Sequence, residues 1–332
     1  MFRSCITLVV ALTASSLMAA QVTVAADGSG DFKTVQAAVD AAPAEGVVIR
    51  IQPGTYHEEI AIEKSHIQLR GLGADPMQVI LSFDKSAGTA GGTGKSQSVL
   101  VTGDDFYAEN LTIENTFSRG RPLTPQGSQA VALRVRGDRA VFRHVRLLGY
   151  QDTLYADGKG CDSEDGPCLP ARQYFADCYI EGNVDFIFGD AVAFFERCEI
   201  RALAHNAVML TAQSKRYEGE RSGYVFDHCR LTAGPGASRV YLGRPWRSHA
   251  SVVFLNTEMG PEIVPAGWLE WKHDDRDPLP TSFYGEYNSS GPGANSKARD
   301  AHSRQLTAAD AARYSVKAWM SGDDGWNPEA VK

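Results

Sequence analysis

A six-residue pattern of apolar and polar positions recurs along the chain. Each copy has apolar residues at positions 1 and 6, an apolar residue at position 4 in all but the last copy, and mostly polar residues between. Positions 4 and 6 alternate as in a β-strand, and the additional residue before them predicts a bend. The copies are AENLTI from Ala108, FRHVRL from Phe142, FADCYI from Phe175, FERCEI from Phe195, FDHCRL from Phe226 and FLNTEM from Phe254.

The copies start at irregular intervals of 34, 33, 20, 31 and 28 residues. A short motif with variable spacing indicates stacked coils that carry outward loops of different lengths. The copies lack the 3.6-residue period of a helical repeat. We therefore predict an all-β fold, a right-handed single-stranded parallel β-helix, which forms a single domain over residues 27–332.

Two short amphipathic helices are expected beside the coils. DFKTVQAAVDAAP, from Asp31 to Pro43, has Ala and Val at helical spacing and stops at a proline. TAADAARYSVKAWM, from Thr307 to Met320, opens on a threonine suited to an N-cap. Each helix is predicted to cap one end of the β-helix.

Composition narrows the possible partners. Of the 332 residues, 43% are hydrophobic and 22% are charged, which is typical of a soluble globular chain. The formal net charge is −7 and there is no long basic run, so nucleic acid and anionic membrane surfaces are poor candidate partners. No segment suggests a subunit interface, and a monomer is expected.

The N-terminus has the features of a secretory signal peptide. Arg3 supplies a positive charge, residues 5–18 are largely apolar, and small residues follow. The apolar stretch is shorter than the roughly 20 residues that a membrane-spanning helix needs, although an uncleaved anchor is the alternative. Residues 1–26 are assigned to the signal peptide, with cleavage after Ala20 or after Ala26, and the mature chain is expected to be secreted.

The cysteines suggest disulfides and no metal site. No C-x-x-C pair occurs and the histidines are scattered, so zinc is not expected. Cys178, Cys198 and Cys229 occupy position 4 of three successive copies, where stacked residues lie about 4.8 Å apart. We predict a Cys178–Cys198 disulfide, with Cys198–Cys229 as the alternative, and a Cys161–Cys168 disulfide that closes a polar hairpin. An odd count of cysteines after the signal peptide leaves one free thiol.

Two aspartates are placed equivalently in the repeat. Asp152 lies ten residues after Phe142, and Asp185 lies ten residues after Phe175, so the two should stack on neighbouring coils. Two carboxylates that close cannot both ionise cheaply, and such a pair can supply a nucleophile or base together with an acid. The alternative is that both are turn-forming surface residues. A serine nucleophile is not favoured, because no G-x-S-x-G motif occurs, and the phosphate-loop-like GGTGKS at residues 91–96 lacks a suitable context.

The residues beside the aspartates indicate which way these side chains face. Strict alternation in NVDFIFGD places Asp185 with Ile187 on one face, towards a groove, and Phe188 on the other, towards the core. Gln151 and Asp152 are adjacent and cannot share a face of a regular strand. If both belong to one site, the strand must end or bend there.

Five short motifs follow one another along the chain: GTYHE (54–58), QAVALR (129–134), GYQDTL (149–154), DFIFG (185–189) and LGRPW (242–246). In these motifs and in their order the chain resembles the pectin methylesterases (pectinesterases), from about Asp27 to Trp271. The family fold is the parallel β-helix that the repeat also predicts.

The resemblance implies distinct catalytic roles. Asp185 would be the nucleophile that attacks a galacturonate methyl ester, and Asp152 would protonate the departing methanol and then activate water. Gln151 and Gln129 would donate amide hydrogens to the tetrahedral oxyanion. Arg244 would orient Asp185 and keep it ionised, although it could also form an ordinary surface ion pair.

The resemblance also implies a substrate and a set of binding residues. The substrate would be methyl-esterified homogalacturonan (pectin), hydrolysed without metal or organic cofactor. Trp246 and Tyr155 would offer apolar surfaces to sugar rings, Thr93 lies near a substrate-contacting threonine of the family, and Phe188 could line the groove. The alternatives are that Trp246 belongs to the core and that Gln129 satisfies backbone groups.

Two other functions remain open at this level. Paired carboxylates also suit a glycosidase that cuts the polygalacturonate backbone, and a noncatalytic β-helix could bind polysaccharide. The two glutamines and Arg244 favour the esterase, because an oxyanion needs hydrogen-bond donors. The interval from Asp152 to Asp185 is longer than the single coil usual in the family, and the Cys161–Cys168 excursion fills the excess.

Overall fold

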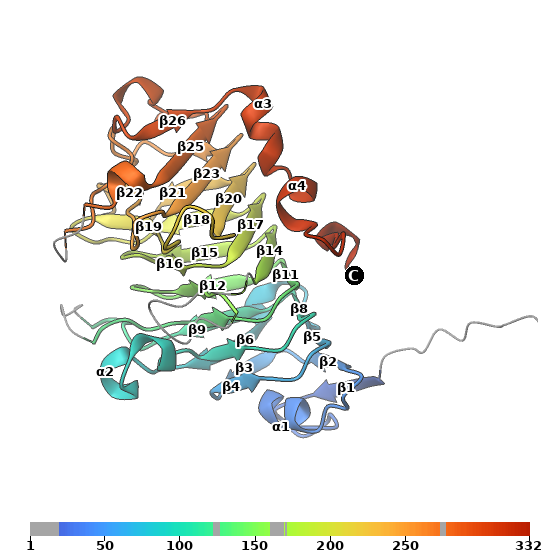
Figure 1. Ribbon diagram of the computed structural model, residues 1–332. Helices are drawn as coiled ribbons and strands as arrows, with labels where there is room; N and C mark the ends of the chain where they lie inside the picture. The colour runs from blue at the N-terminus through green and yellow to red at the C-terminus, as the bar shows by residue number, and fades with distance from the viewer. Residues whose placement is uncertain (1–19, 122–126, 160–168, 170, 273–276) are drawn as a thin grey trace, which may run out of the picture.

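The chain forms stacked coils whose strands build three sheets. The computed structural model describes residues 20–121, 127–159, 169, 171–272 and 277–332. Three sheets of eleven, eight and seven strands run along the molecule (Figure 1). The pairings between strands of these sheets are parallel, and each sheet takes about one strand from each successive coil. This arrangement is a parallel β-helix, so the predicted fold class is confirmed.

The strands are divided among the sheets as follows. Sheet A holds β1 (Ala20–Val24), β2 (Val47–Ile51), β5 (Ile67–Gly71), β8 (Tyr107–Glu109), β11 (Ala140–Arg143), β14 (Arg172–Ala176), β17 (Val192–Glu196), β20 (Gly223–Asp227), β23 (Ser251–Leu255), β25 (Phe283–Tyr287) and β26 (Ser303–Gln305). Sheet B holds β3 (Gly54–His57), β6 (Val79–Phe83), β9 (Thr112–Asn115), β12 (Arg146–Leu148), β15 (Tyr179–Gly182), β18 (Glu199–Ala202), β21 (Arg230–Ala233) and β24 (Glu258–Met259). Sheet C holds β4 (Ile60–Ile62), β7 (Val99–Val101), β10 (Leu133–Val135), β13 (Leu154–Ala156), β16 (Ile187–Gly189), β19 (Val208–Gln213) and β22 (Val240–Gly243).

The helices are short and lie outside the coils. The α-helices are α1 (Val35–Asp40), α2 (Ala87–Ala90), α3 (Ala308–Ala311) and α4 (Val316–Met320). The 3₁₀ helices are η1 (Pro76–Gln78), η2 (Thr93–Lys95), η3 (Leu279–Thr281), η4 (Ser296–Ala298), η5 (Ala312–Tyr314) and η6 (Pro328–Ala330). In the described part of the chain, no helix is long and apolar enough to cross a membrane.

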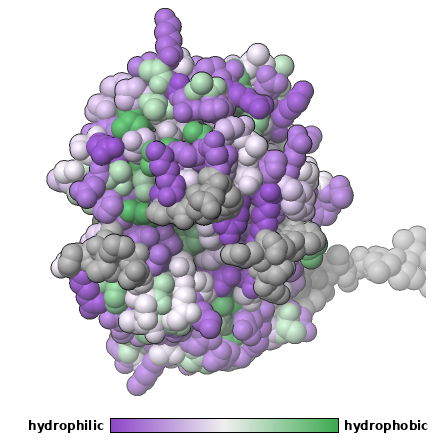
Figure 2. All heavy atoms as spheres, turned by 60° about the vertical axis from the view of Figure 1, so that its left-hand side comes forward, coloured by the Kyte–Doolittle hydropathy of each residue, from purple (hydrophilic) through white to green (hydrophobic). Residues whose placement is uncertain are grey.

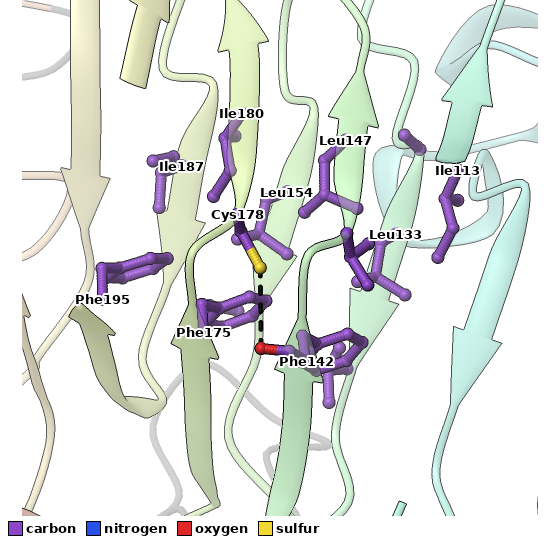
Figure 3. Packing of buried hydrophobic residues seen from close by; sticks show 14 of the residues in the cluster. Ile113, Leu133, Phe142, Leu147, Leu154, Phe175, Cys178, Ile180, Ile187 and Phe195 are labelled. Atoms are coloured by element: carbon purple, nitrogen blue, oxygen red, sulfur yellow. Dashed lines mark hydrogen bonds between the residues drawn. The ribbon is translucent and has the colours of Figure 1, made fainter. Parts of the chain in front are cut away.

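Position 1 of the repeat builds a column of aromatic rings inside the coils. Phe142, Phe175, Phe195, Phe226 and Phe254 stack in that order, with successive ring centroids 4.6, 4.8, 4.4 and 4.7 Å apart. All five are fully buried, and Figure 3 shows part of the column beside aliphatic residues of the other sheets. Because parallel strands pair in register, one residue type repeated at one position becomes a continuous core.

Position 3 of the repeat makes the predicted bend. Each residue there has left-handed backbone angles, with φ between 47° and 55°. One left-handed residue ends the sheet A strand and redirects the chain into sheet B, where positions 4 and 6 point inward. The residues are Asn110, His144, Asp177, Arg197, His228 and Asn256.

The three cysteines at position 4 are free, buried thiols, so the predicted Cys178–Cys198 disulfide and its Cys198–Cys229 alternative are wrong. The Sγ atom of Cys178 instead lies 3.6 Å from the carbonyl oxygen of Phe142 (Figure 3). Stacked side chains run parallel, so their Cβ atoms keep the interstrand spacing of about 4.8 Å, beyond the ~3.5–4.5 Å that a disulfide needs. The predicted Cys161–Cys168 pair lies outside the described residues.

The N-terminal helix is where the sequence places it, although it is shorter than predicted. α1 packs on β1, β2 and β4 at the N-terminal end of the coils (Figure 1). Its N-cap is Thr34, whose side chain accepts a hydrogen bond from the Ala37 amide.

The C-terminal segment differs from the prediction in two ways. The expected single helix is divided into α3, η5 and α4, because Ser315 is extended and caps a new helix. The segment covers the outer face of sheet A instead of an end of the β-helix, with α4 packed on β17. The residue before each position 1 is apolar and points outward, so sheet A needs this cover; these residues are Val141, Tyr174, Phe194, Val225 and Val253.

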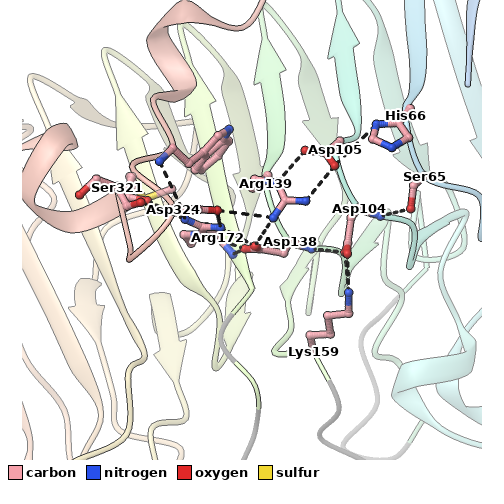
Figure 4. Close-up of polar contacts among 12 residues, drawn as sticks. Ser65, His66, Asp104, Asp105, Asp138, Arg139, Lys159, Arg172, Ser321 and Asp324 are labelled. Atoms are coloured by element: carbon pink, nitrogen blue, oxygen red, sulfur yellow. Dashed lines mark hydrogen bonds and ion pairs between the residues drawn. The ribbon is translucent and has the colours of Figure 1, made fainter. Parts of the chain in front are cut away.

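An ion-pair network fastens this segment to the coils (Figure 4). Arg172 donates to Asp324 Oδ1 at 2.6 Å and to Asp138 Oδ1 at 2.9 Å, joining the C-terminal segment to two coils. Arg139 forms a fork with Asp105, with distances of 2.6 and 2.8 Å.

Candidate active site

All nine catalytic and substrate-binding residues predicted from the sequence line one cleft of about 500 Å³ beside sheet C. Figure 2 shows this side of the molecule, where hydrophilic side chains predominate and hydrophobic ones lie among them. The nine residues are Thr93, Gln129, Gln151, Asp152, Tyr155, Asp185, Phe188, Arg244 and Trp246.

The two aspartates occupy equivalent places on adjacent coils. β13 and β16 pair with Leu154 opposite Ile187, and each aspartate lies two residues before its member of this pair. The Asp152 amide also donates to the Val184 carbonyl of the next coil at 3.0 Å. The stacking inferred from the repeat is therefore present in the backbone.

Left-handed backbone angles explain how adjacent Gln151 and Asp152 can serve one cleft. Asp152 has φ 64° and Asp185 has φ 50°, so both lie at bends before their strands begin. Asp is among the few residue types that adopt this conformation readily. The bend turns the chain between Gln151 and the strand, and strand alternation does not apply across it.

The same bend overturns the alternation predicted around Asp185. Phe186 and Ile187 both lie in the main core, whereas Phe188 belongs to a separate cluster at the cleft. Alternation starts at Ile187, the first residue of β16, and not before Asp185. The expectation that Phe188 faces the core is therefore wrong.

Arg244 holds the Asp185 carboxylate in a two-point fork. Its Nε and Nη2 atoms donate to Oδ1 at 2.8 Å and to Oδ2 at 2.6 Å. The two side chains are 11% and 10% exposed, so this is not an ordinary surface pair. The Trp271 ring lies 4.5 Å from the guanidinium carbon and supports it through a cation–π contact. A fork of this kind stabilises the charged carboxylate and fixes its orientation.

Asp152 is in the opposite electrostatic situation. Burial raises the pKa of its carboxyl well above the usual range, the charge on Asp185 raises it further, and only Arg244 lowers it. Among the described residues, no cation forms an ion pair with Asp152. The site therefore combines one carboxyl group that is bound by a guanidinium with a neighbouring carboxyl group whose pKa is raised.

Gln129 and Gln151 bring two amide groups to the same cleft. Their backbones are tied to neighbouring coils, since the Gln129 carbonyl accepts from Ala87 at 2.8 Å and the Gln151 carbonyl from Ala130 at 3.1 Å. Within the described part of the chain, their side chains have no hydrogen-bond partner. Both amides are thus available to a ligand, which is what an oxyanion site requires.

Aromatic rings form an apolar surface in the cleft. Tyr155 and Phe188 stack with centroids 4.3 Å apart, and Phe188 meets Trp246 at 5.9 Å in a tilted arrangement. Trp246 is partly exposed and does not belong to the main core. Such a surface suits the apolar faces of sugar rings or a methyl group.

Three residues that line the cleft were not predicted. Trp271 ends the GWLEW run, where an aromatic residue close to the matched motifs could have indicated it. Gly94 follows Thr93 directly. Ala212 pairs with Phe188 across β16 and β19, and a small apolar residue in a strand carries no sequence signal.

The described residues contain no group of three or more His, Cys, Asp or Glu side chains that could hold a metal ion. The polar groups that face the cleft include two carboxyl groups, two side-chain amides and a guanidinium. Arg244 already donates hydrogen bonds to both carboxyl oxygens of Asp185. This set suits reaction at a carbonyl group through charge and hydrogen bonding.

Comparisons with known proteins find relatives that match most of the chain. The family model described as Pectinesterase matches residues 21–323. Probable pectinesterase 49 of Arabidopsis thaliana is 36% identical over 301 residues, which cover 89% of this chain and 78% of that protein. Of some longer relatives the chain spans only 48%.

Solved structures show the same likeness over most of the chain. The pectin methylesterase from carrot superimposes with a TM-score of 0.81 at 33% identity, covering 93% of this chain and 96% of that one. A pectin methylesterase in complex with a hexasaccharide gives 0.76 at 31% identity, covering 94% and 99%. With the family model matched over nearly the whole length, this chain belongs to the pectinesterase family.

Proposed function

We propose that this chain hydrolyses the methyl esters of methyl-esterified homogalacturonan, with Asp185 as the nucleophile and Asp152 as the acid and base. The observation that carries the proposal is that the two stacked carboxyl groups have different electrostatic environments. Arg244 holds Asp185 in a fork, whereas burial and the charge of Asp185 raise the pKa of Asp152. Family membership and the solved hexasaccharide complex of a related pectin methylesterase support a polysaccharide substrate.

In the first half of the reaction, an oxygen of Asp185 attacks the ester carbonyl carbon. The carbonyl oxygen becomes an oxyanion, to which the amides of Gln129 and Gln151 donate hydrogen bonds. The carbon–methoxy bond then breaks as Asp152 gives its proton to the departing oxygen, and methanol leaves. The product is an acyl anhydride between Asp185 and the galacturonate carboxyl.

In the second half, Asp152 is a carboxylate and acts as a base. It takes a proton from a water molecule, whose oxygen attacks the acyl carbon of the anhydride. The bond to Asp185 breaks, the galacturonate carboxyl group is released, and Asp152 is again protonated. No electron transfer is needed, and water is the only co-reactant.

The polysaccharide would lie along the cleft, with sugar rings against Trp246 and Tyr155 and with Thr93 and Phe188 beside it. We also propose that the chain acts as a secreted monomer, as one domain whose signal peptide ends by Ala20. β1 begins at Ala20, pairs with β2 and buries Val24 in the core, so cleavage after Ala26 would remove a strand of sheet A. N-terminal sequencing of the exported protein tests this, since a first residue beyond Gln21 would contradict it.

An assay that follows two products tests the chemistry. Purified protein with methyl-esterified pectin should release methanol and protons while the number of reducing ends stays constant. Reducing ends without methanol would indicate cleavage of the backbone and would refute the proposal. Inclusion of excess chelator should leave methanol release unchanged.

A further inference from the structure

Arg134 joins three parts of the structure around the cleft. It lies on β10, between the core residues Leu133 and Val135, so its side chain points out of the coil. In the sheet C register it is opposite Tyr155 of β13. Its guanidinium carbon lies 4.8 Å from the Tyr155 ring centroid, so the cation stacks against one of the aromatic residues of the cleft.

The same guanidinium makes three hydrogen bonds in two directions. Nε and Nη2 donate to Oδ2 of Asp157 at 2.9 and 2.6 Å. Nη1 donates to the backbone carbonyl of Gly94 at 2.7 Å. Asp157 is buried and belongs to the coil that carries Tyr155. Gly94 belongs to η2 (Thr93–Lys95), in the connection between β6 and β7.

The contact between Arg134 and Gly94 ties η2 to sheet C. Thr93 and Gly94 line the cleft, but the preceding Gly91 and Gly92 have φ of 77° and 139°, and a Cβ on either would meet no atom within 4 Å. Glycines in open space allow the backbone many conformations. On the other side, Ser96 is buried and its hydroxyl accepts from the Val131 amide at 3.2 Å. Gly91 and Gly92 also donate backbone hydrogen bonds to the Ala87 carbonyl of α2, both at 2.9 Å, so the Arg134 bond adds an anchor that ties Gly94 to sheet C.

Gly94 itself is adapted to the guanidinium. A Cβ at this position would lie 2.8 Å from Nη1 of Arg134. The φ of Gly94 is not in the left-handed region, so the backbone would accept alanine and the close approach is the constraint.

We propose that Arg134 is a positioning residue that sets the affinity of the cleft for a galacturonan chain, by holding Thr93 and Gly94 in place beside Tyr155. The inference rests on the proposed function for the identity of the substrate. Arg134 touches neither aspartate of the site, and it acts through residues that contact sugar units away from the reacting ester.

The test compares Arg134→Gln with wild type on two substrates, methyl-esterified hexagalacturonate and methyl-esterified digalacturonate. Loss of a hydrogen bond to a charged group should raise KM for the hexamer about 10-fold. kcat should stay within about 2-fold and KM for the dimer should change little, because the catalytic groups keep their contacts.

Two further variants separate positioning from stability. Arg134→Lys retains a charge beside Asp157 but cannot bond both Asp157 and Gly94, so the KM defect should persist. Gly94→Ala should give a similar defect while the Asp157 contact remains. Arg139→Gln is the matched control, because Arg139 makes a comparable fork with Asp105 and does not line the cleft; it should lower thermal stability and leave KM unchanged.

An unchanged KM for the hexamer in both Arg134→Gln and Gly94→Ala would overturn the inference, and so would full recovery in Arg134→Lys. Equal defects on both substrates would also contradict it. If the wild-type chain releases no methanol, the proposed function fails instead. Hexagalacturonate binding, followed by the fluorescence of Trp246 and Trp271, then still tests Arg134.

Discussion

Two Asp–Arg forks in this molecule have nearly the same local geometry. Asp177 and Asp185 both have left-handed backbone angles, with φ of 54° and 50°. Arg197 donates to the two oxygens of Asp177 at 2.9 and 3.0 Å, and Arg244 to those of Asp185 at 2.8 and 2.6 Å. Asp177 lies at the turn between sheets A and B, and Asp185 lies in the cleft.

The forks differ in burial and in their neighbours. Arg197 and Asp177 are 48% and 33% exposed, against 11% and 10% for Arg244 and Asp185. On the adjacent coils Asp177 has His144 and Arg197 at equivalent positions, whereas Asp185 has Asp152. Water screens the first pair, and such pairs contribute only about 0–1 kcal/mol to stability. The fork at Asp185 therefore differs from the one at Asp177 in being buried and in having a second acid stacked on it.

Replacing the proposed nucleophile should have the largest effect. Asp185→Ala is expected to lower kcat for methanol release about 10⁴-fold or more, because it removes the carboxylate that would form the acyl intermediate. The matched Asp177→Ala should stay within about 2-fold of wild type, since a surface pair contributes little.

Asp185→Asn controls for loss of the buried fork, because alanine leaves the Arg244 charge without its partner. Circular dichroism should show a native fold for the asparagine variant together with the same loss of activity. Substantial methanol release by a folded Asp185→Asn protein would show that Asp185 is not the nucleophile.

Replacing the proposed acid should lower activity by less. In the proposed mechanism Asp152 gives a proton to methanol and takes one from water, so Asp152→Asn should lower kcat about 10²–10⁴-fold. The proposed first step needs protonated Asp152, so wild-type activity should fall as pH rises above the raised pKa of Asp152. An alkaline limb that is identical in Asp152→Asn would contradict this assignment.

Asp152→Asn should lower activity but raise the stability of the folded state at neutral pH. Since the folded pKa of Asp152 is raised from 3.8, the folded state binds more protons than the unfolded state above about pH 4. The contribution of Asp152 to the free energy of unfolding is thus present below that pH and is lost as pH rises towards its folded pKa. Asp152→Asn should remove this loss and raise the neutral-pH melting temperature relative to wild type.

The repeat predicted the aspartate pair because register is preserved over the long excursion. Ten residues separate Asp152 and Asp185 from their motif phenylalanines, and those phenylalanines stack in the core. A fixed offset within a coil can be read from the sequence alone, and the bend before position 4 was predicted in the same way. The chemistry of each residue came from the family motifs, since the repeat is symmetrical and does not distinguish nucleophile from acid.

Other features depend on tertiary structure that a strand pattern does not encode. Alternation pointed Phe188 towards the core, which is wrong because Asp185 has left-handed backbone angles and alternation starts only at Ile187. The Cys178–Cys198 disulfide was expected from backbone spacing, but parallel side chains keep the sulfurs on carbonyl groups instead. α4 was assigned to an end of the coils because the outward apolar residues of sheet A, such as Tyr174 and Phe194, were not recognised as a surface that needs cover.

Of the substitutions at Asp185, Asp152 and Arg244, the one at Arg244 should lower kcat the least. It also allows the most direct comparison between the two forks. Arg244→Gln keeps a hydrogen-bond donor but removes the charge and one of the two contacts with Asp185. kcat should fall about 10²-fold, the usual cost of losing one preorganised electrostatic group, while KM changes little. Arg197→Gln breaks a fork of the same geometry and should leave kcat unchanged, with less than about 1 kcal/mol lost in urea unfolding. Because the two substitutions are chemically identical, a difference in kcat would show that the fork in the cleft serves the reaction, whereas a fork of the same geometry outside the cleft does not. Equal activities in the two variants would mean that the Asp185 fork has only the structural role of its exposed counterpart.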